Sequence, residues 1–337
     1  MKGWALKLFS TATRGSLFTQ LTRFLEKMPE GDSPMLRVLT YHRIGYPDQH
    51  PDLYPGLISA DPNNFELQMA HLAAYYHPIS VQELLDVYDS GHKLPKRAVL
   101  VTFDDAYMDF EEHAWPTLKC HGIPAALFVP TAFPDQHDRV FWWDHLYLIL
   151  RHASDLELIN TPLGRLPVDK ERNLLSSYKQ LAKFFKSLPL ETTRTLVQEL
   201  AYQVEAPAPN TAVLSWDVLR RLAREGVTLG AHTRFHPVLN HATLKEVEAE
   251  VAGSLTDLEH EIGPVPRIFA YPAGGVNEAV VQILINLDVR IAFSTKRGIN
   301  NLKSGNRLNL KRINVGQASS LSVFGVQLSS AHAYLSR

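Results

Sequence analysis

Short apolar runs alternate with longer amphipathic stretches along most of the chain. The runs are typical of strands and fall at residues 36–41, 99–103, 124–129, 227–231, 268–271, 291–294 and 310–315. Helical periodicity lies between them, at residues 65–74, 81–88, 107–122, 216–226, 243–262 and 278–286. This alternation predicts an α/β fold with a parallel sheet and crossover helices, and the number of such units favours a barrel.

The alternation of strand-like and helical stretches is interrupted at residues 135–212, where Leu-rich helical segments predict a helical insertion. The insertion opens with Trp142 and Trp143. Their rings could stack on the apolar face of a sugar, or they could pin the insertion to the barrel. We therefore expect a barrel over residues 36–320, interrupted by this insertion, and a C-terminal tail over residues 321–337.

The N-terminal segment, residues 1–35, is basic and apolar at once. It has neither the long apolar core nor the small-residue cleavage site of a secretory signal, and it is not apolar enough for a membrane span. An amphipathic helix on a membrane surface is one interpretation. A helix packed on the domain, or a frayed tail, is the alternative. The expected location is cytoplasmic, with membrane association as a second option.

Composition narrows the function classes. Of 337 residues, 45% are apolar and 20% charged, which allows a substantial core. A net charge of -1 gives no electrostatic case for a nucleic-acid partner. The one cysteine, Cys120, excludes an internal disulfide framework and is expected to be a packing residue.

Two adjacent carboxylates, Asp104 and Asp105, end the strand at residues 99–103. Successive side chains of a strand point to opposite faces, so one acid could hold a metal while the other moves a proton. The alternative is that they only start the next helix, because Asp is a favoured N-cap.

Two histidines four residues apart, His232 and His236, follow the strand at residues 227–231. In a helical turn this spacing puts both imidazoles on one side. Two histidines and one carboxylate are a recurrent ligand set for catalytic zinc. The alternative is one packed and one solvated histidine.

Weaker signals follow two other strands. The strand at residues 268–271 runs into Tyr271-Pro272 and then Gly274, which permits close approach of a ligand but also suits an ordinary turn. The strand at residues 36–41 ends at His42, where a barrel would place a site residue.

These stretches together resemble the polysaccharide deacetylase family, the metal-dependent carbohydrate esterases with a NodB-homology domain. The resemblance rests on Thr102-Phe-Asp-Asp105, His232-Thr-Arg-Phe-His236 and Phe269-Ala-Tyr-Pro-Ala-Gly274, with Leu39-Thr-Tyr-His-Arg-Ile44 and Leu310-Lys-Arg-Ile-Asn-Val315 in support. It implies a deformed (β/α) barrel and a hydrolase that removes acetyl groups from N-acetylated sugars.

Carried over motif by motif, the resemblance makes Asp105, His232 and His236 the metal ligands and Asp104 the general base. The implied metal is Zn²⁺, although Co²⁺, Ni²⁺ or Mn²⁺ also suit two imidazoles and a carboxylate. The substrate is expected to contact two further sets of residues, which are Tyr271, Pro272 and Gly274 on the third motif and Trp142 and Trp143 on the insertion.

The chain departs from the family pattern at two places. The family usually has an arginine before the proline of its third motif, where this chain has Tyr271. We expect Arg312, on the last strand, to supply the charge that aligns Asp104. The family's late histidine, which protonates the leaving amine, is also missing from residues 308–317. We expect His42 to take this role.

Other functions stay open at this point. The same machinery could cleave another non-peptide C–N bond, as in a ureide or a formamide, or act on an ester. The missing arginine and histidine also suit a carbohydrate-binding homologue that has lost catalysis. The intact set of Asp104, Asp105, His232 and His236 argues against that, because a binding protein needs no base beside a metal site.

Overall fold

The computed structural model describes residues 33–136, 138–169, 173–207 and 213–329, and the structural statements below concern these residues. The N-terminal segment, whose amphipathic character was noted above, lies almost entirely outside them. Within the described residues, no helix is both long enough and apolar enough to cross a membrane.

Seven parallel strands form a closed barrel. Around the ring they run in the order β1 (Met35–Tyr41), β13 (Leu310–Asn314), β11 (Ile291–Arg297), β10 (Ile268–Ala270), β9 (Thr228–Ala231), β6 (Ala125–Val129) and β5 (Ala98–Phe103). Pairing of β1 with β5, with Thr40 opposite Thr102, closes the ring. The predicted barrel is confirmed, and its parallel strands bring all their carboxyl ends to one mouth.

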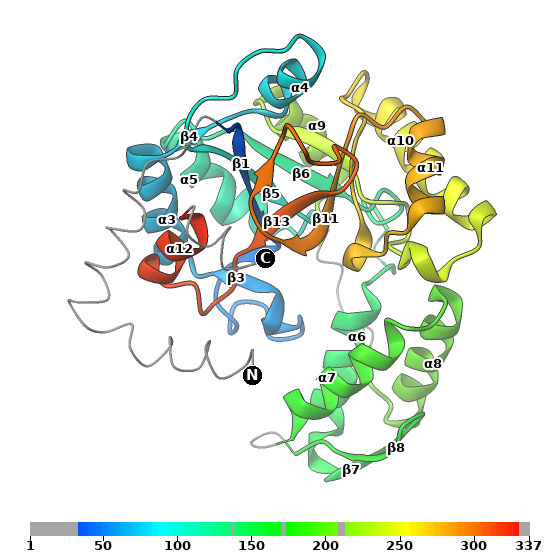
Figure 1. Cartoon of the computed structure of the whole chain (residues 1–337). Helices are drawn as coiled ribbons and strands as arrows, with labels where there is room; N and C mark the ends of the chain where they lie inside the picture. The colour runs from blue at the N-terminus through cyan, green and yellow to red at the C-terminus, as the bar shows by residue number, and fades with distance from the viewer. Residues whose placement is uncertain (1–32, 137, 170–172, 208–212, 330–337) are drawn as a thin grey trace.

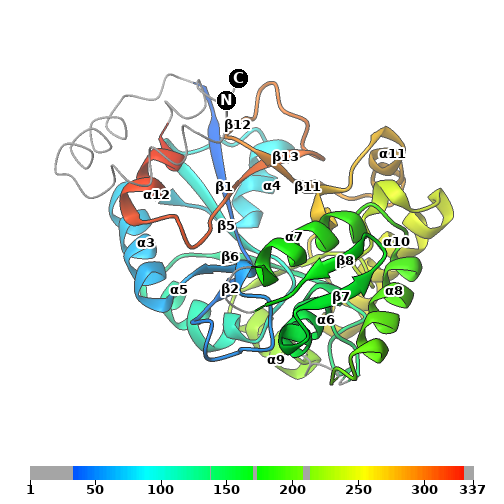
Figure 2. The ribbon, with the colours of Figure 1, turned by 90° about the horizontal axis from the view of Figure 1, so that it is seen from below.

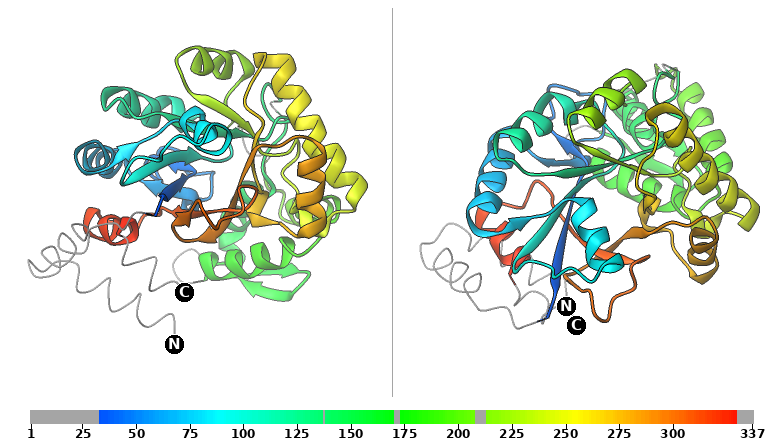
Figure 3. Two further views of the ribbon diagram at one scale, coloured as in Figure 1. Left: turned by 45° about the horizontal axis from the view of Figure 1, so that its top comes forward. Right: turned by 90° about the horizontal axis from the view of Figure 1, so that it is seen from above.

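Helices surround this barrel, as the view from above in Figure 3 shows. They are α3 (Pro62–Tyr75), α5 (Trp115–Cys120), α9 (Trp216–Arg224), α10 (Leu244–Ile262), α11 (Glu278–Asn286) and α12 (Leu321–Leu328), while α4 (Val81–Asp89) covers one end of the barrel. Short elements complete the fold, namely β2 (Arg43–Ile44), β3 (Ile58–Ala60), β4 (His77–Pro78), β12 (Asn300–Asn301) and the single turns η1 (Pro55–Leu57), η4 (Leu239–His241) and η5 (Pro272–Gly274).

Alternation along the strands separates two layers of core. On β5, Ala98 and Leu100 belong to the cluster inside the barrel, while Val99 and Val101 pack outward against the helices. Helix α4 contributes to the inner cluster and lies at the end of the barrel away from the insertion (Figure 1). Side chains thus fill the barrel at one end, and the candidate catalytic and metal-binding residues lie at the other.

The helix expected from residue 107 begins later than its periodicity indicates. A π-helical turn, η2 (Phe110–Ala114), precedes α5. Asp105 and Ala106 have φ of 72° and 51°, which takes the chain out of helical geometry directly after β5. Asp109 then accepts hydrogen bonds from the Arg43 side chain and a backbone N–H of β2, at 2.8 and 3.2 Å. The start of this segment is therefore held in an irregular conformation before α5 begins.

The other end of this segment corrects a second expectation. Cys120, the last residue of α5, is a free thiol with an exposed side chain, so the prediction that it packs in the core is wrong. The buried positions of α5 are Trp115 and Leu118, and Cys120 follows them on the solvent side of the last turn. An apolar side chain near a helix end does not by itself reveal which face it occupies.

The insertion forms its own layer below the barrel in Figure 1, and Figure 2 shows it from its outer side. It contains α6 (Trp142–His152), the turn η3 (Ala153–Asp155), β7 (Leu158–Thr161), β8 (Gly164–Pro167), α7 (Leu174–Phe185) and α8 (Leu190–Gln203). A separate apolar cluster holds these helices together. The β7–β8 hairpin is an addition to the helical insertion expected from sequence.

Candidate metal centre

The end of β5 directs its two carboxylates to different places. Asp104 continues the inward face of Leu100, and its backbone N–H donates to the Tyr41 carbonyl at 3.0 Å. At Asp105 the positive φ turns the chain, so this side chain leaves the strand pattern. Both residues are buried. The strand geometry therefore gives the two acids separate environments, as their adjacency suggests.

Arg312 binds Asp104 through both arms of its guanidinium. The Nη1 and Nη2 groups donate to Asp104 Oδ1 and Oδ2 at 2.8 and 2.7 Å, and Arg312 Nε donates to the Ser294 carbonyl at 2.9 Å. Burial opposes ionisation of Asp104, but the Arg312 charge and hydrogen bonds, together with His232, lower its pKa below the usual value. Asp104 is thereby held as an oriented carboxylate.

Asp105, His232 and His236 converge on one point. Their candidate ligand atoms lie within 4.8 Å of one another. The Oδ1 atom of Asp105 is 3.4 Å from His232 Nε2 and 3.3 Å from His236 Nε2. This Oδ1 is buried and has no hydrogen-bond partner among the described residues. Burial would raise the pKa of Asp105, but the two imidazoles outweigh it and keep the pKa well below normal. An orphaned carboxylate oxygen facing two imidazole nitrogens fits a divalent cation.

The two histidines lie on a tight loop and not on the helical turn suggested by their spacing. Thr233 and His236 both have positive φ, 63° and 61°. Thr233 Oγ1 accepts from the His236 backbone N–H at 2.9 Å and donates to the His232 carbonyl. His232 Nδ1 lies 2.8 Å from the Ala270 carbonyl, an arrangement that fixes the ring and leaves Nε2 toward Asp105.

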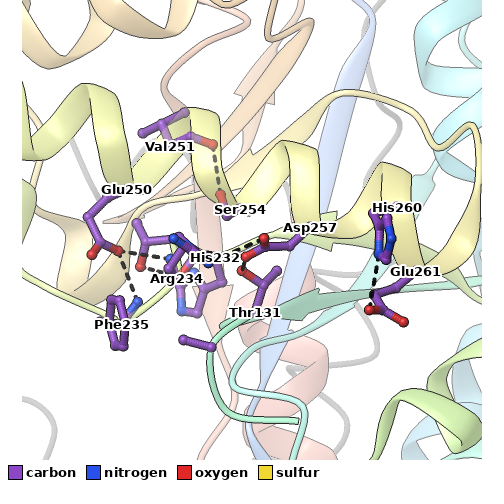
Figure 4. Close-up of polar contacts among 12 residues, drawn as sticks. Thr131, His232, Arg234, Phe235, Glu250, Val251, Ser254, Asp257, His260 and Glu261 are labelled. Atoms are coloured by element: carbon purple, nitrogen blue, oxygen red, sulfur yellow. Dashed lines mark hydrogen bonds and ion pairs between the residues drawn. The ribbon is translucent and has the colours of Figure 1, made fainter.

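Two carboxylates of α10 hold this loop from outside (Figure 4). Glu250 accepts the backbone N–H groups of Arg234 and Phe235, both at 2.9 Å. Asp257 accepts from Thr131 Oγ1 at 2.6 Å and from Arg234 Nε at 2.9 Å. Sequence reasoning missed both acids, although their seven-residue spacing on one helix puts them on one face.

A cavity of about 400 Å³ opens beside the cluster. It is lined by Asp104, Asp105, His232 and His236 from the barrel, and by His42 at the end of β1. His42 thus shares the cavity with both aspartates. The remaining lining residues are Tyr54, Leu57, Trp142, Trp143, Tyr178, Lys179, Ala182, Lys183, Lys186, Val238, Ala273 and Thr295.

A family model described as "Polysaccharide deacetylase" matches residues 91–292. The chain belongs to the polysaccharide deacetylase family. The matched span includes both aspartates and both histidines of the cluster, whereas His42 and Arg312 lie outside it.

Curated relatives of this polysaccharide deacetylase match over different lengths. YxkH of Bacillus subtilis (strain 168), whose name places it among the polysaccharide deacetylases, is 25% identical over 255 residues. That match covers 76% of this chain and 64% of YxkH. The poly-beta-1,6-N-acetyl-D-glucosamine N-deacetylase of Escherichia coli (strain K12) is 36% identical over 50 residues, which is 15% of this chain and 7% of that protein. The chain thus spans less than two thirds of each relative's length.

Solved structures share the fold. The Streptococcus pyogenes deacetylase PplD, in complex with acetate, gives a TM-score of 0.56 at 19% identity, covering 86% of this chain and 97% of PplD. IcaB from Ammonifex degensii gives 0.56 at 19% identity, covering 89% of this chain and 99% of IcaB. At this identity the likeness establishes the barrel fold.

In this polysaccharide deacetylase, the insertion touches the cluster through Trp143. The centroids of the Trp143 and His236 rings lie 4.7 Å apart, and Trp143 Nε1 donates to the Tyr107 hydroxyl at 2.9 Å. Tyr107 in turn donates to Asp144 at 2.7 Å, and Asp144 also accepts the Tyr54 backbone N–H at 2.8 Å. Burial raises the pKa of Asp144 to about 6. Trp143 therefore links the insertion to the barrel, and both it and Trp142 still reach the cavity.

The third motif is placed differently from expectation. Tyr271 is fully buried, with its hydroxyl donating to the Leu308 carbonyl at 2.7 Å. Tyr271, Pro272 and Gly274 are absent from the cavity lining, which this stretch reaches through Ala273. Gly274 has a φ of 74°, and a Cβ there would sit 2.0 Å from Thr295 Oγ1, so packing alone accounts for glycine.

Proposed function

We propose that this protein is a divalent-metal-dependent hydrolase that removes the acetyl group from N-acetylated sugars. The observation that carries the proposal is the convergence of Asp105, His232 and His236 beside an ionised, oriented Asp104. Membership of the polysaccharide deacetylase family supports the same reaction class. The names of relatives that act on N-acetylglucosamine polymers point to amino-sugar substrates.

Asp105, His232 and His236 would hold the cation, and Zn²⁺ suits this donor set best. When bound, the cation supplies Lewis-acid activation of an amide carbonyl and of water. Asp104 accepts the proton of the attacking water, because its bidentate partner keeps it ionised and fixes its direction. Asp105 would thus hold the metal, while its neighbour Asp104 acts as the general base.

His42 is the candidate proton donor to the leaving amine. It lines the cavity, and residues 308–317, which include the last strand, contain no histidine that could compete for the role. Its backbone is held by the Ser59 hydroxyl, whose oxygen accepts the His42 N–H at 3.0 Å. An amine leaves an amide slowly unless its nitrogen is protonated, so a donor at this position is chemically required.

Aromatic side chains in the cavity offer a sugar ring an apolar surface. Trp142 and Trp143 reach the cavity from α6, and Tyr54 and Tyr178, which stack with ring centroids 3.9 Å apart, also line it. Sugar rings present C–H faces that pack on such aromatic surfaces, so the acetamido group can be directed inward to Asp104.

Acetate release from N-acetylglucosamine oligomers, measured with added Zn²⁺, tests the proposal. The wild type should release acetate, and Asp104→Asn should lower the rate by about 10²–10⁴-fold, the usual contribution of a general base. Asp288→Asn, at an exposed position remote from the cavity lining, is the matched control and should retain wild-type activity. Equal rates for Asp104→Asn and wild type would overturn the assignment. If the oligomers release no acetate, and the protein instead releases ammonia from a ureide or formate from a formamide supplied as substrate, the proposal shifts to that C–N bond.

A further inference from the structure

Three lysines of the insertion share the cavity with the candidate metal centre. Lys179, Lys183 and Lys186 all line it, and they come from α7 and its C-cap. Their spacing of four and then three residues puts them on one face of the helix. The lysines line the cavity from the insertion, while the acids and histidines line it from the barrel.

Within the part of the chain that the structure describes, no carboxylate forms an ion pair with Lys179, Lys183 or Lys186. Nearby arginines differ in this respect. Arg194 pairs with Glu191 and Arg234 pairs with Asp257, both at 2.9 Å. The lysine charges are thus the ones available to a ligand.

The two aspartates that line the cavity already interact with other groups of the barrel. Asp104 is compensated by the two hydrogen bonds from Arg312. Asp105 faces His232 and His236, and a bound divalent cation would make that cluster positive. The whole chain has a net charge of only -1, so the positive cavity is a local feature. A neutral sugar would leave it uncompensated.

The lysines line the same cavity as the two aspartates and the two histidines, so one bound saccharide can contact both sets. Desolvation lowers the pKa of Lys186, which is still an exposed residue, and the charge of Asp105 partly counteracts this effect. Lysines near a helix C-terminus also favour the helix dipole, which bears on Lys183 and Lys186. Lys179 lies in the middle of α7, where the dipole gives no reason for a cation.

We propose that the substrate is an anionic N-acetylated saccharide whose phosphate or carboxylate group binds Lys179, Lys183 and Lys186. This inference rests on the proposed deacetylation, because it places the acetamido group at the barrel floor and the anion against α7. Ammonium groups act as point charges toward either oxyanion, so the shared chemistry is an anion held a short distance from the acetamido group.

Calorimetry with the wild-type protein in EDTA tests this inference. The chelator prevents turnover of the probe, and the measurement does not depend on the folding of a variant. The probes are N-acetylglucosamine 1-phosphate, N-acetylmuramic acid as a carboxylate, and neutral N-acetylglucosamine. At least one anionic probe should bind about tenfold or more tightly than the neutral sugar, since bonds to charged groups carry such differences. The probe that binds more tightly identifies phosphate or carboxylate as the group.

Substitution of all three lysines by alanine should abolish that preference, and substitution by arginine should retain it. Lys303→Ala, an exposed lysine beside β12 at the opposite end of the barrel, is the control and should change nothing. The preference should also shrink as salt is raised. Equal affinity for neutral and anionic sugars, or a preference that survives in the triple alanine variant, would overturn the inference. Acetate release from neutral oligomers by the wild type reports on the proposed function separately.

Discussion

Replacement of Arg312 is the most informative perturbation of this site. Arg312 is fully buried and makes two hydrogen bonds to Asp104, at 2.8 and 2.7 Å. Arg312→Ala leaves a buried carboxylate without its partner, which costs about 3–5 kcal/mol of stability. Arg312→Lys keeps the charge but loses the planar fork, so its cost in stability should be smaller while the direction of Asp104 is lost.

The expected effect on catalysis follows from the role of Asp104. If Arg312 acts by aligning the base, Arg312→Lys should lower kcat by about 10–10²-fold, a fraction of the contribution of a general base. Arg37→Lys is the matched control, because Arg37 is an equally buried arginine that donates to the Leu328 carbonyl far from the cavity lining. It should lower stability without lowering kcat in the folded protein.

A double-mutant cycle completes the test. Acetate release is measured for Arg312→Lys, Asp104→Asn and the double variant, with the folded fraction checked by circular dichroism. In the Asp104→Asn background, Arg312→Lys should cost nothing further, because the group that it aligns is no longer a base. Two effects that multiply fully would refute the reasoning, since Arg312 would then act on the reaction independently of Asp104.

Three further predictions concern the surroundings of the site. Glu250→Ala removes the acceptor of two loop N–H groups and should weaken Zn²⁺ binding by about 10–100-fold in calorimetry, while an unchanged affinity would show that the loop holds itself. His42→Ala should slow amide hydrolysis far more than hydrolysis of an acetyl ester with a phenolate leaving group, which needs no proton; equal losses on both would remove His42 as the donor. Burial raises the pKa of Asp144 to about 6, so wild-type stability should fall as pH rises from about 4 through 6, by about 3 kcal/mol relative to Asp144→Asn. Urea unfolding of both proteins across that range measures the difference, and a constant difference would contradict it.

The barrel could be predicted because the patterns that indicate its strands and helices lie within short stretches of sequence. Apolar runs and amphipathic stretches alternate with the right lengths, and the Thr243–Glu246 capping box at the start of α10 is present in the structure as the spacing predicts. Asp104 and Asp105 end a strand and His232 follows one. In a parallel barrel the ends of all strands meet at one mouth, so these residues were expected to converge.

Other parts of the site depend on packing between segments that are distant in sequence. The support of the histidine loop by Glu250 and Asp257 arises from the path of α10, and the lysines reach the cavity only because α7 packs across it. The turn at Thr233 and His236 requires positive φ at residues that rarely adopt it, so a helical spacing was misleading there. The third motif contacts the cavity through Ala273, which a motif of glycine and proline does not indicate.

Metal binding by Asp105, His232 and His236 is the central claim, and a calorimetric titration with Zn²⁺ tests it most directly. Chelator-treated wild type should bind a single ion, and the control Asp288→Asn should behave in the same way. Asp105→Asn should lose most of the affinity, because the amide oxygen that replaces the carboxylate carries no charge. Failure of the wild type to bind Zn²⁺ or any other divalent cation, or unchanged binding by Asp105→Asn, would contradict the assignment of this cluster.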